Sequence, residues 1–181
     1  YVDGKKIDAQ LIRQYASYFR ADVLGLKAGS YSVKVVPVDA AGKEMAGANT
    51  VSNLLVKNYN REGFAHFNFE GIGAYNNDGT LKSDAKVLYI TASTAKTVST
   101  EVITGAKNKK ETVKGLQAII DAYQKGYDTT PIAFRIIGKV SLADLDGTSS
   151  SAEGLQIKGK TGYSTMNMTF EGVGDDATIY G

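Results

Sequence analysis

Met168-Thr-Phe-Glu-Gly-Val-Gly-Asp-Asp-Ala-Thr-Ile-Tyr180 is the stretch on which the fold prediction depends. Apolar and polar residues alternate before Gly172, which is the pattern of a short, half-buried strand closed by a glycine turn. The same pattern occurs in Leu155-Gln-Ile-Lys-Gly159 and, in a longer form, in Pro131-Ile-Ala-Phe-Arg-Ile-Ile-Gly138. Short strands of this kind, separated by irregular loops, are typical of a parallel β-helix and equally of a β-sandwich.

One segment has a helical pattern instead. Between Glu111 and Lys125 the apolar residues recur at spacings of three and four, so they would share one face of a helix. These residues are Val113, Leu116, Ile120 and Tyr123, with Ile119 beside them. Gly126 follows in the position of a C-terminal cap. A single amphipathic helix among strands must cover apolar surface, and we expect it to cover the open end of a β-structure.

The first part of the chain predicts antiparallel strands. Asp3-Gly4 lies between two short extended segments and suits a tight type I′ turn. Tyr31, Val33 and Val35 alternate with polar residues, and a second alternating run, Val51-Ser-Asn-Leu-Leu-Val56, comes after a turn. This pattern predicts two paired strands with one apolar face.

The composition sets further limits. Of 181 residues, 43% are hydrophobic and 22% are charged, which is globular rather than disordered composition. The 21 basic and 19 acidic residues are too balanced to predict nucleic-acid binding. The absence of cysteine excludes disulfides, thiol catalysis and cysteine metal sites. No apolar run approaches the ~18–20 residues of a membrane span, and the first residues do not resemble a signal peptide.

Leu26-Lys-Ala-Gly-Ser-Tyr31, followed by alternating valines, resembles the tyrosine corner of a fibronectin type III β-sandwich. In such a corner a tyrosine near the start of a strand hydrogen-bonds to nearby backbone. An unrelated hairpin with a tyrosine in its core is the alternative. Only about four or five strands fit before residue 57, against ~7 in a complete sandwich. We therefore expect the chain to begin inside such a domain.

Several motifs occur in an order that resembles the N-terminal part of bacterial pectate lyases of polysaccharide lyase family 1. They are Gly73-Ala-Tyr-Asn-Asn-Asp-Gly-Thr-Leu81, Val87-Leu-Tyr-Ile-Thr91, the predicted helix, Phe134-Arg-Ile-Ile-Gly138 and Met168 to Ala177. The resemblance implies the helix-capped start of a right-handed parallel β-helix at residues 71–181, incomplete at its C-terminus. An incomplete fibronectin type III-like sandwich at 1–57 and a linker at 58–70 would precede it. The predicted fold class is therefore all-β.

The resemblance also implies a function: a secreted, extracellular bacterial enzyme that cleaves polygalacturonate (pectin) by β-elimination. In that family acidic side chains hold calcium, which binds the substrate carboxylate, and an arginine removes the C5 proton. No residue of this chain aligns with those groups. We therefore predict no catalytic residue and no metal ligand, assign no substrate-binding residue, and expect this chain alone to be inactive.

The expected partner is pectin or another acidic plant polysaccharide, with neither nucleic acid nor a membrane span. An apolar edge left open at the end of the strands also predicts self-association or contact with the remainder of the protein. Two other functions stay open: a non-catalytic glycan-binding module, and a cell-surface adhesin built on a β-helix.

Three acidic groups resemble metal sites but suit turns better. Asp175 and Asp176 would point to opposite faces of a strand, and the small residues on either side favour a turn. Asp144-Leu-Asp-Gly-Thr-Ser-Ser-Ser-Ala-Glu153 resembles a calcium loop, but its glycine and final glutamate come too early. Asn76-Asn-Asp-Gly79 lacks the final glutamate altogether.

Four further features carry little functional weight. Gly172-Val-Gly-Asp-Asp-Ala177 matches a dinucleotide fingerprint, but the residues after it read as a strand instead of the required helix. Gly71-Ile-Gly73 lacks the third small residue. His66 is the only histidine, and without a Gly-x-Ser-x-Gly motif we expect it to have a packing role. The sequon Asn167-Met-Thr169 has no weight in a bacterial protein.

The arginines and one aromatic group complete the candidates. The arginines are Arg13, Arg20, Arg61 and Arg135. Arg135 alone lies in the lyase-like part, on the strand face opposite Phe134, where it would be solvated or pair with a neighbouring coil. The aromatic group comprises Tyr15, Tyr18 and Phe19. These rings suit either an exposed sugar-stacking platform or the partly buried edge of a sandwich.

Overall fold

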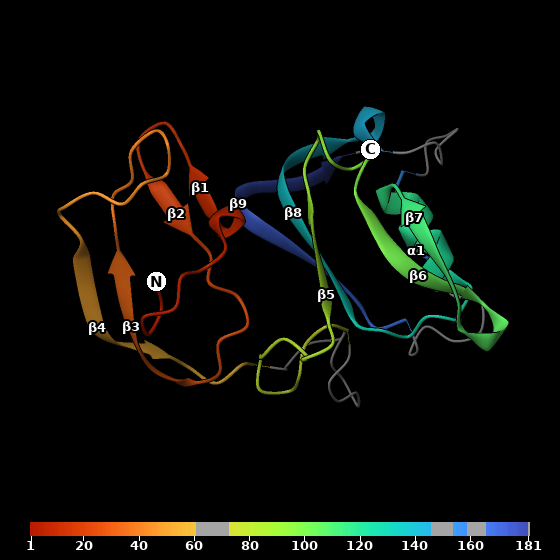
Figure 1. The fold of residues 1–181 in the computed structure, drawn as a ribbon, viewed down its shortest axis with the longest axis horizontal. Helices are drawn as coiled ribbons and strands as arrows, with labels where there is room; N and C mark the ends of the chain where they lie inside the picture. The colour runs from red at the N-terminus through yellow and green to blue at the C-terminus, as the bar shows by residue number, and fades with distance from the viewer. Residues whose placement is uncertain (61–72, 146–153, 159–165, 181) are drawn as a thin grey trace.

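The computed structural model describes residues 1–60, 73–145, 154–158 and 166–180, and most of its regular structure is β (Figure 1). The strands are β1 Ile12–Gln14, β2 Phe19–Ala21, β3 Gly29–Val35, β4 Asn49–Val56, β5 Lys86–Ile90, β6 Ser99–Gly105, β7 Lys109–Lys114, β8 Ile132–Ser141 and β9 Met168–Tyr180. The α-helix is α1 Leu116–Gln124, and short 3-10 helices are η1 Ala9–Leu11, η3 Ala106–Asn108 and η4 Leu142–Asp144. The all-β prediction is confirmed at this level.

The predicted turn at Asp3-Gly4 is present. Asp3 has φ 45° and Gly4 has φ 78°, the positive values that a type I′ turn requires. Val2 and Lys5 exchange two backbone hydrogen bonds across it, of 2.8 and 2.9 Å. Val2 also forms a bridge to Val33, so the first residues lie along the edge of β3. The turn predicted at Asp3-Gly4 is therefore confirmed.

Strands β3 and β4 form an antiparallel pair, and the predicted hydrogen bond of Tyr31 is present. The Tyr31 hydroxyl donates to the carbonyl oxygen of Lys27 at 2.7 Å, four residues back along the chain. Tyr31 lies opposite Leu54, and Val33 lies opposite Val51, so the alternating apolar residues of both strands share one face.

A parallel sheet with the order β5-β8-β9 forms the second part of the structure. The strands adjoin in the order in which they occur in the chain. Their register places Leu88, Phe134 and Phe170 in one row across the sheet. The rings of Phe134 and Phe170 stack with centroids 4.8 Å apart and planes inclined by 21°. The residues that alternate in the sequence thus form apolar rows that run across the strands.

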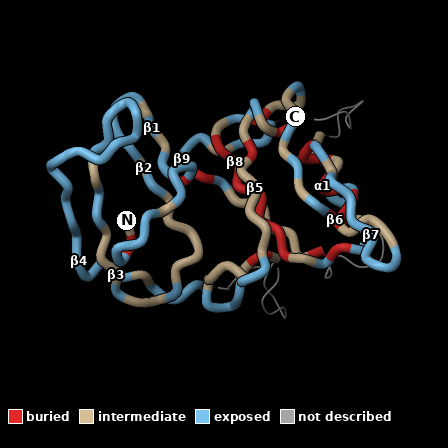
Figure 2. The backbone as a smooth tube through the Cα atoms, in the orientation of Figure 1, coloured by how far each residue is buried: buried red, intermediate tan, exposed pale blue. Residues whose placement is uncertain are grey.

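Strand β8 is the most protected part of this sheet, because both of its faces are covered. On one face Phe134 and Ile136 pack in a core that includes Ile120 and Tyr123 of α1. On the other face Ile137 packs in a smaller cluster with residues of β9 and η1. Figure 2 shows the buried backbone gathered along β8 and α1. A parallel strand covered on both sides is expected to be apolar along most of its length, as β8 is.

The helix predicted from Glu111 to Lys125 is wrong at its N-terminal end. Residues 109–114 form β7, which pairs with β6 in an antiparallel hairpin. Gly115 then adopts φ 100°, which a helix cannot include, and α1 begins at Leu116. Val113 belongs to β7, although it packs against the same core as the helix. The predicted cap is correct: Gly126 has φ 78° and its N–H donates to the Tyr123 carbonyl at 2.9 Å.

The strand predicted at Leu155–Gly159 is also wrong for the part that the structure describes. Residues 154–158 form no strand. The Gln117 side chain of α1 instead donates to the Gln156 carbonyl and accepts from the Gln156 N–H, each at 2.8 Å. The side-chain amide of Gln117 thus forms the two hydrogen bonds with the Gln156 backbone that a neighbouring strand would form. Residues 61–70 of the predicted linker lie outside the described residues.

Candidate functional site

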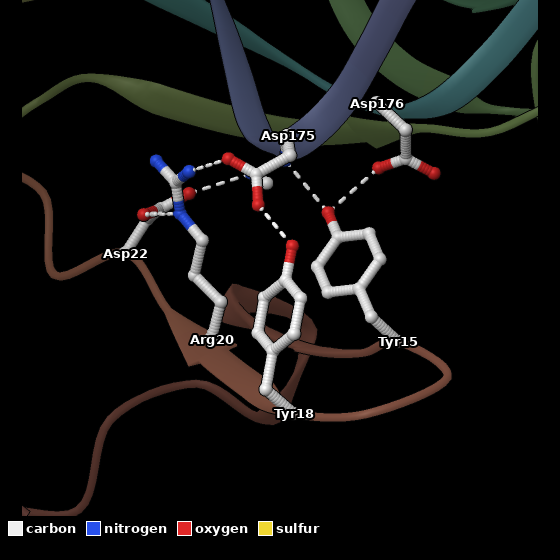
Figure 3. A network of polar contacts seen from close by, with 7 residues as sticks. Tyr15, Tyr18, Arg20, Asp22, Asp175 and Asp176 are labelled. Carbon is white, nitrogen blue, oxygen red and sulfur yellow. Dashed lines mark hydrogen bonds and ion pairs between the residues drawn. The ribbon is translucent and has the colours of Figure 1, made fainter.

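A polar network joins the β1–β2 hairpin to β9 (Figure 3). Arg13 and Arg20 lie directly opposite each other in the hairpin, so their side chains share one face. That face is directed at β9, whereas Phe19 on the opposite face is 71% exposed. The hairpin thus presents two guanidinium groups side by side to the parallel sheet.

The partner of the hairpin is a bulge in β9. Val173 pairs with Ile137 of β8, but the next pair is Thr178 with Lys139. Residues 174–177 are therefore accommodated opposite the single residue Gly138. Gly174 has φ 89°, a conformation that glycine adopts without strain. The sequence predicted a turn at Asp175 and Asp176, but both residues lie within β9, and the bulge directs both carboxylates to the hairpin.

Each aspartate receives one tyrosine and one arginine from the hairpin region. Tyr18 donates its hydroxyl to Asp175 at 2.5 Å, and Arg20 forms an ion pair with the same carboxylate. Tyr15 donates to Asp176 at 2.8 Å, and Arg13 pairs with Asp176 at 3.2 Å. Figure 3 shows Tyr15, Tyr18 and Arg20 reaching from the hairpin toward Asp175 and Asp176 of the bulge. The contact matches two negative charges with two positive charges.

Backbone groups of the bulge also take part. The Gly174 N–H donates to Asp22 at 2.6 Å, and the Asp175 N–H donates to the Tyr15 hydroxyl at 2.7 Å. Asp22 in turn accepts from Arg20 Nε at 2.7 Å. The rings of Tyr15 and Tyr18 stack with centroids 4.8 Å apart. Both tyrosine hydroxyls therefore have structural partners, although Tyr18 is 47% exposed.

The electrostatics of the network favour ionised carboxylates. The hydrogen bond from Tyr15, together with the nearby Arg13 charge, lowers the pKa of Asp176 below its usual value. The hydrogen bond to Asp175 raises the pKa of Tyr18, so this phenol stays neutral. A calcium ion is a poor fit here, because two guanidinium groups already neutralise the pair. Asp175 and Asp176 are therefore committed to the hairpin.

A second network lies on the face of the parallel sheet opposite α1. Arg135 of β8 is only 6% exposed, and its Nε pairs with Glu171 Oε1 of β9 at 2.8 Å. Its two terminal nitrogens donate to the hydroxyls of Tyr89 at 3.0 Å and Tyr75 at 3.2 Å. The Tyr75 hydroxyl donates to Glu171 at 2.7 Å. The prediction that Arg135 pairs with a neighbouring strand is confirmed, and the solvated alternative is wrong.

Arg135 stays protonated in this second network, so it cannot act as a base. Burial alone would lower the pKa of Arg135, but hydrogen bonds to Glu171 and the two tyrosines outweigh it and raise the pKa. For Tyr75 the effect of burial is the opposite, because burial disfavours the charged phenolate and raises the pKa to about 12. The guanidinium group is therefore permanently protonated and committed to its neighbours. Its role is to pair with the partly buried Glu171 carboxylate.

The other acidic candidates have structural roles where they are described. Asp144 accepts from the Ser141 N–H at 2.8 Å and from the Ser141 hydroxyl at 2.6 Å, which is a capping box for η4. The rest of that predicted loop, residues 146–153, lies outside the described residues. Asp78 accepts from the Thr80 hydroxyl at 2.6 Å within the predicted turn. The turn at residues 76–79 is confirmed.

The remaining candidates add no chemistry. Residues 178–180 continue β9, so no helix follows the dinucleotide-like motif. In the sequon, Asn167 donates its side-chain amide to the Thr129 carbonyl at 2.9 Å. Thr169 accepts from the Ala74 N–H at 2.9 Å. His66, Arg61 and Gly71 lie outside the described residues.

Across residues 1–60, 73–145, 154–158 and 166–180, no three histidine, cysteine or acidic residues come together as a metal-binding group. Over the same ranges, none of the helices has the length and apolar character needed to traverse a lipid bilayer. No protein-family model, curated protein or solved structure matches the chain.

Proposed function

We propose that this chain is the front portion of a secreted, calcium-dependent pectate lyase that cleaves polygalacturonate, with residues 73–180 beginning a right-handed parallel β-helix. The observation that supports this proposal is the order of β5, β8 and β9. They are parallel, they adjoin in chain order, and they carry a row of stacked apolar residues from Leu88 to Phe170. A chain that winds coil by coil has these properties, because each turn adds the next strand to the edge of the sheet.

The first part of the chain supports the same proposal. Bacterial pectate lyases often carry a fibronectin-like module ahead of the lyase domain, and we assign residues 1–57 to such a module. The hydrogen bond from the Tyr31 hydroxyl to the Lys27 carbonyl has the geometry of a tyrosine corner. The antiparallel pairing of β3 and β4 after it is also what such a sandwich requires.

In this proposal the calcium ligands and the catalytic arginine belong to coils beyond this chain. The reason is that the candidate side chains described above already have structural partners. Asp175 and Asp176 hold the hairpin, Asp144 caps η4, and Arg135 is bound to Glu171. Calcium, when bound by the complete enzyme, would acidify the proton next to the substrate carboxylate.

The test is the calcium-dependent rise in ultraviolet absorbance that unsaturated uronides produce on de-esterified polygalacturonate. The assay compares this 181-residue chain with the full-length product of its gene, each with calcium and with a chelator. We expect activity from the full-length protein with calcium only, and none from the chain. A full-length protein without activity would contradict the lyase function. Activity in the isolated chain would contradict the location of the site.

Exposed aromatic side chains favour a second candidate, a non-catalytic glycan-binding module. Phe19 is 71% exposed and the adjacent Tyr18 is 47% exposed, and such rings stack well on sugars. Affinity electrophoresis in gels containing polygalacturonate tests this candidate with the variant F19A, with L55A on β4 as the control for an exposed apolar residue. Retardation that F19A abolishes, without cleavage by the full-length protein, would favour binding over catalysis.

A further inference from the structure

Residues 8–22 lie across the outer face of the parallel sheet, and we name this segment the strap. It includes η1, β1 and β2. Leu11 of the strap packs on Ile137 and Val173 of the sheet. The hairpin of the strap meets the β9 bulge through the network of Figure 3. A segment near the start of the chain thus covers strands that come much later.

The strap hairpin has little reason to be stable without the bulge. Its strands are three residues long each, and isolated two-stranded hairpins are marginal in water. Arg13 and Arg20 are directly opposite each other, and like charges in that position repel. Within the strap only Arg20 has a carboxylate partner, Asp22 at 2.7 Å, and docking adds Asp175 beside Arg20 and supplies Arg13 with Asp176. Formation of the hairpin and its docking are therefore coupled.

The contact that holds the strap is also accessible to solvent. The Arg13 and Asp176 side chains are 27% and 45% exposed, and those of Arg20 and Asp175 are 41% and 46% exposed. Ion pairs at this exposure weaken as salt screens them. The β8–β9 core beneath depends on apolar contacts, which salt does not screen. The strap and the sheet should therefore respond differently to ionic strength.

We propose that the strap is an electrostatic latch, which closes on the β9 bulge as an ordered hairpin and opens as a disordered segment when the Asp175 and Asp176 charges are removed or screened. Opening exposes Ile137 and Val173 and admits water toward the buried Arg135. The proposal is independent of lyase activity. It concerns a two-state segment of this chain, with the aspartate pair as its switch.

Backbone hydrogen exchange measures the latch directly. The reporters are the Tyr15 amide, bonded to the Tyr18 carbonyl at 2.9 Å, and the Asp22 amide, bonded to the Leu11 carbonyl at 3.1 Å. In the isosteric variant D175N/D176N we expect both amides to exchange about tenfold faster or more, as the loss of two exposed ion pairs implies. The amides of β8 should be unchanged. The variant D84N removes one exposed carboxylate on a turn remote from the network and serves as control.

A salt titration of the unaltered chain provides the second measurement and needs no variant to fold. From about 0.01 M to about 1 M NaCl the Debye length falls from about 30 Å to about 3 Å. We expect the two strap reporters to lose protection over this range while β8 keeps it. Unchanged reporters in both experiments would overturn the proposal. Equal acceleration of the reporters and β8 would also overturn it, because the strap would then open only with the whole fold.

Discussion

Arg135 of β8 and Glu171 of β9 are register neighbours in the parallel sheet, and the buried Arg135 side chain forms an ion pair of 2.8 Å with the partly buried Glu171 carboxylate. Tyr75 and Tyr89 supply the remaining hydrogen bonds of this pair. A buried ion pair is tolerated when its members are matched and satisfied in this way. Removal of one partner should therefore cost far more than removal of both.

The first prediction follows from this pair. The variant R135M leaves the partly buried Glu171 carboxylate without a counter-charge, and we expect it to lose up to about 3 kcal/mol of unfolding free energy. Urea denaturation measures the loss. The double variant R135M/E171L removes both charges and should recover most of the stability. A loss below about 1 kcal/mol in R135M would show that water reaches the carboxylate.

Phe134 provides a test of the apolar core. Its side chain is fully buried and stacks on Phe170, so F134A creates a cavity between β8 and β9. We expect F134A to lower the free energy of unfolding by about 3–5 kcal/mol. Leu55 is 69% exposed, so L55A is the matched control and should change stability by no more than about 0.5 kcal/mol. Similar losses in the two variants would contradict the position of the core.

The third prediction concerns Asp128 and the dependence of the free energy of unfolding on pH. Burial alone would raise the pKa of Asp128, but hydrogen bonds from Ile103 and Thr130, with the Lys86 charge nearby, outweigh it and lower the pKa. The ionised Asp128 carboxylate therefore stabilises the folded state above the unfolded-state pKa of about 3.9. This stabilisation is lost as the pH falls through the lower folded-state pKa.

Urea unfolding between about pH 7 and pH 2 measures this dependence. The variant D128N should be less stable than the unaltered chain at neutral pH, and the two stabilities should converge in acid. D84N, which alters an exposed carboxylate, should follow the unaltered chain throughout. A constant difference between D128N and the unaltered chain would mean that ionisation of Asp128 does not stabilise the fold.

The fourth prediction is that a side chain at Gly174 of the bulge would prevent the strap from docking. A Cβ atom at this position would overlap the Tyr15 hydroxyl, and the φ of 89° disfavours any other residue. We expect G174A to free the strap, seen as faster exchange of the Tyr15 amide, without a change of charge. Gly42 has φ 78° and open space around it, so G42A carries the backbone strain alone and is the control. Equal exchange of the Tyr15 amide in the two variants would contradict the close packing at the bulge.

Local patterns were sufficient where neighbouring residues determine the structure. Asp3-Gly4 predicted its turn because both positions require positive φ. The alternation around Phe134 predicted β8 because apolar residues that recur at every second position over this length indicate a β-strand. The glycine after the helix predicted its C-terminal end for the same kind of local reason.

The sequence did not predict β7 or the strap. The spacing from Val113 to Leu116 continues the helical period by coincidence, and pairing with β6 overrides it. The strap depends on Arg13 and Arg20 meeting Asp175 and Asp176, and no local pattern links residues so far apart. Matched pairs of charges in the two segments were the only signal, and such pairs are common in any sequence.

The strap contacts also determine when this fold can be completed during synthesis. Its hydrogen bonds to the β9 bulge join residues 152 to 163 positions apart. At about 5–20 residues per second, a ribosome needs about 10–30 s to deliver the bulge after the strap has emerged. Throughout that interval Arg13 lacks its Asp176 partner, and Arg20 has only Asp22 of the strap as a counter-charge. The strap is therefore synthesised well before the segment that orders it, and it becomes ordered only after the β9 bulge has been made.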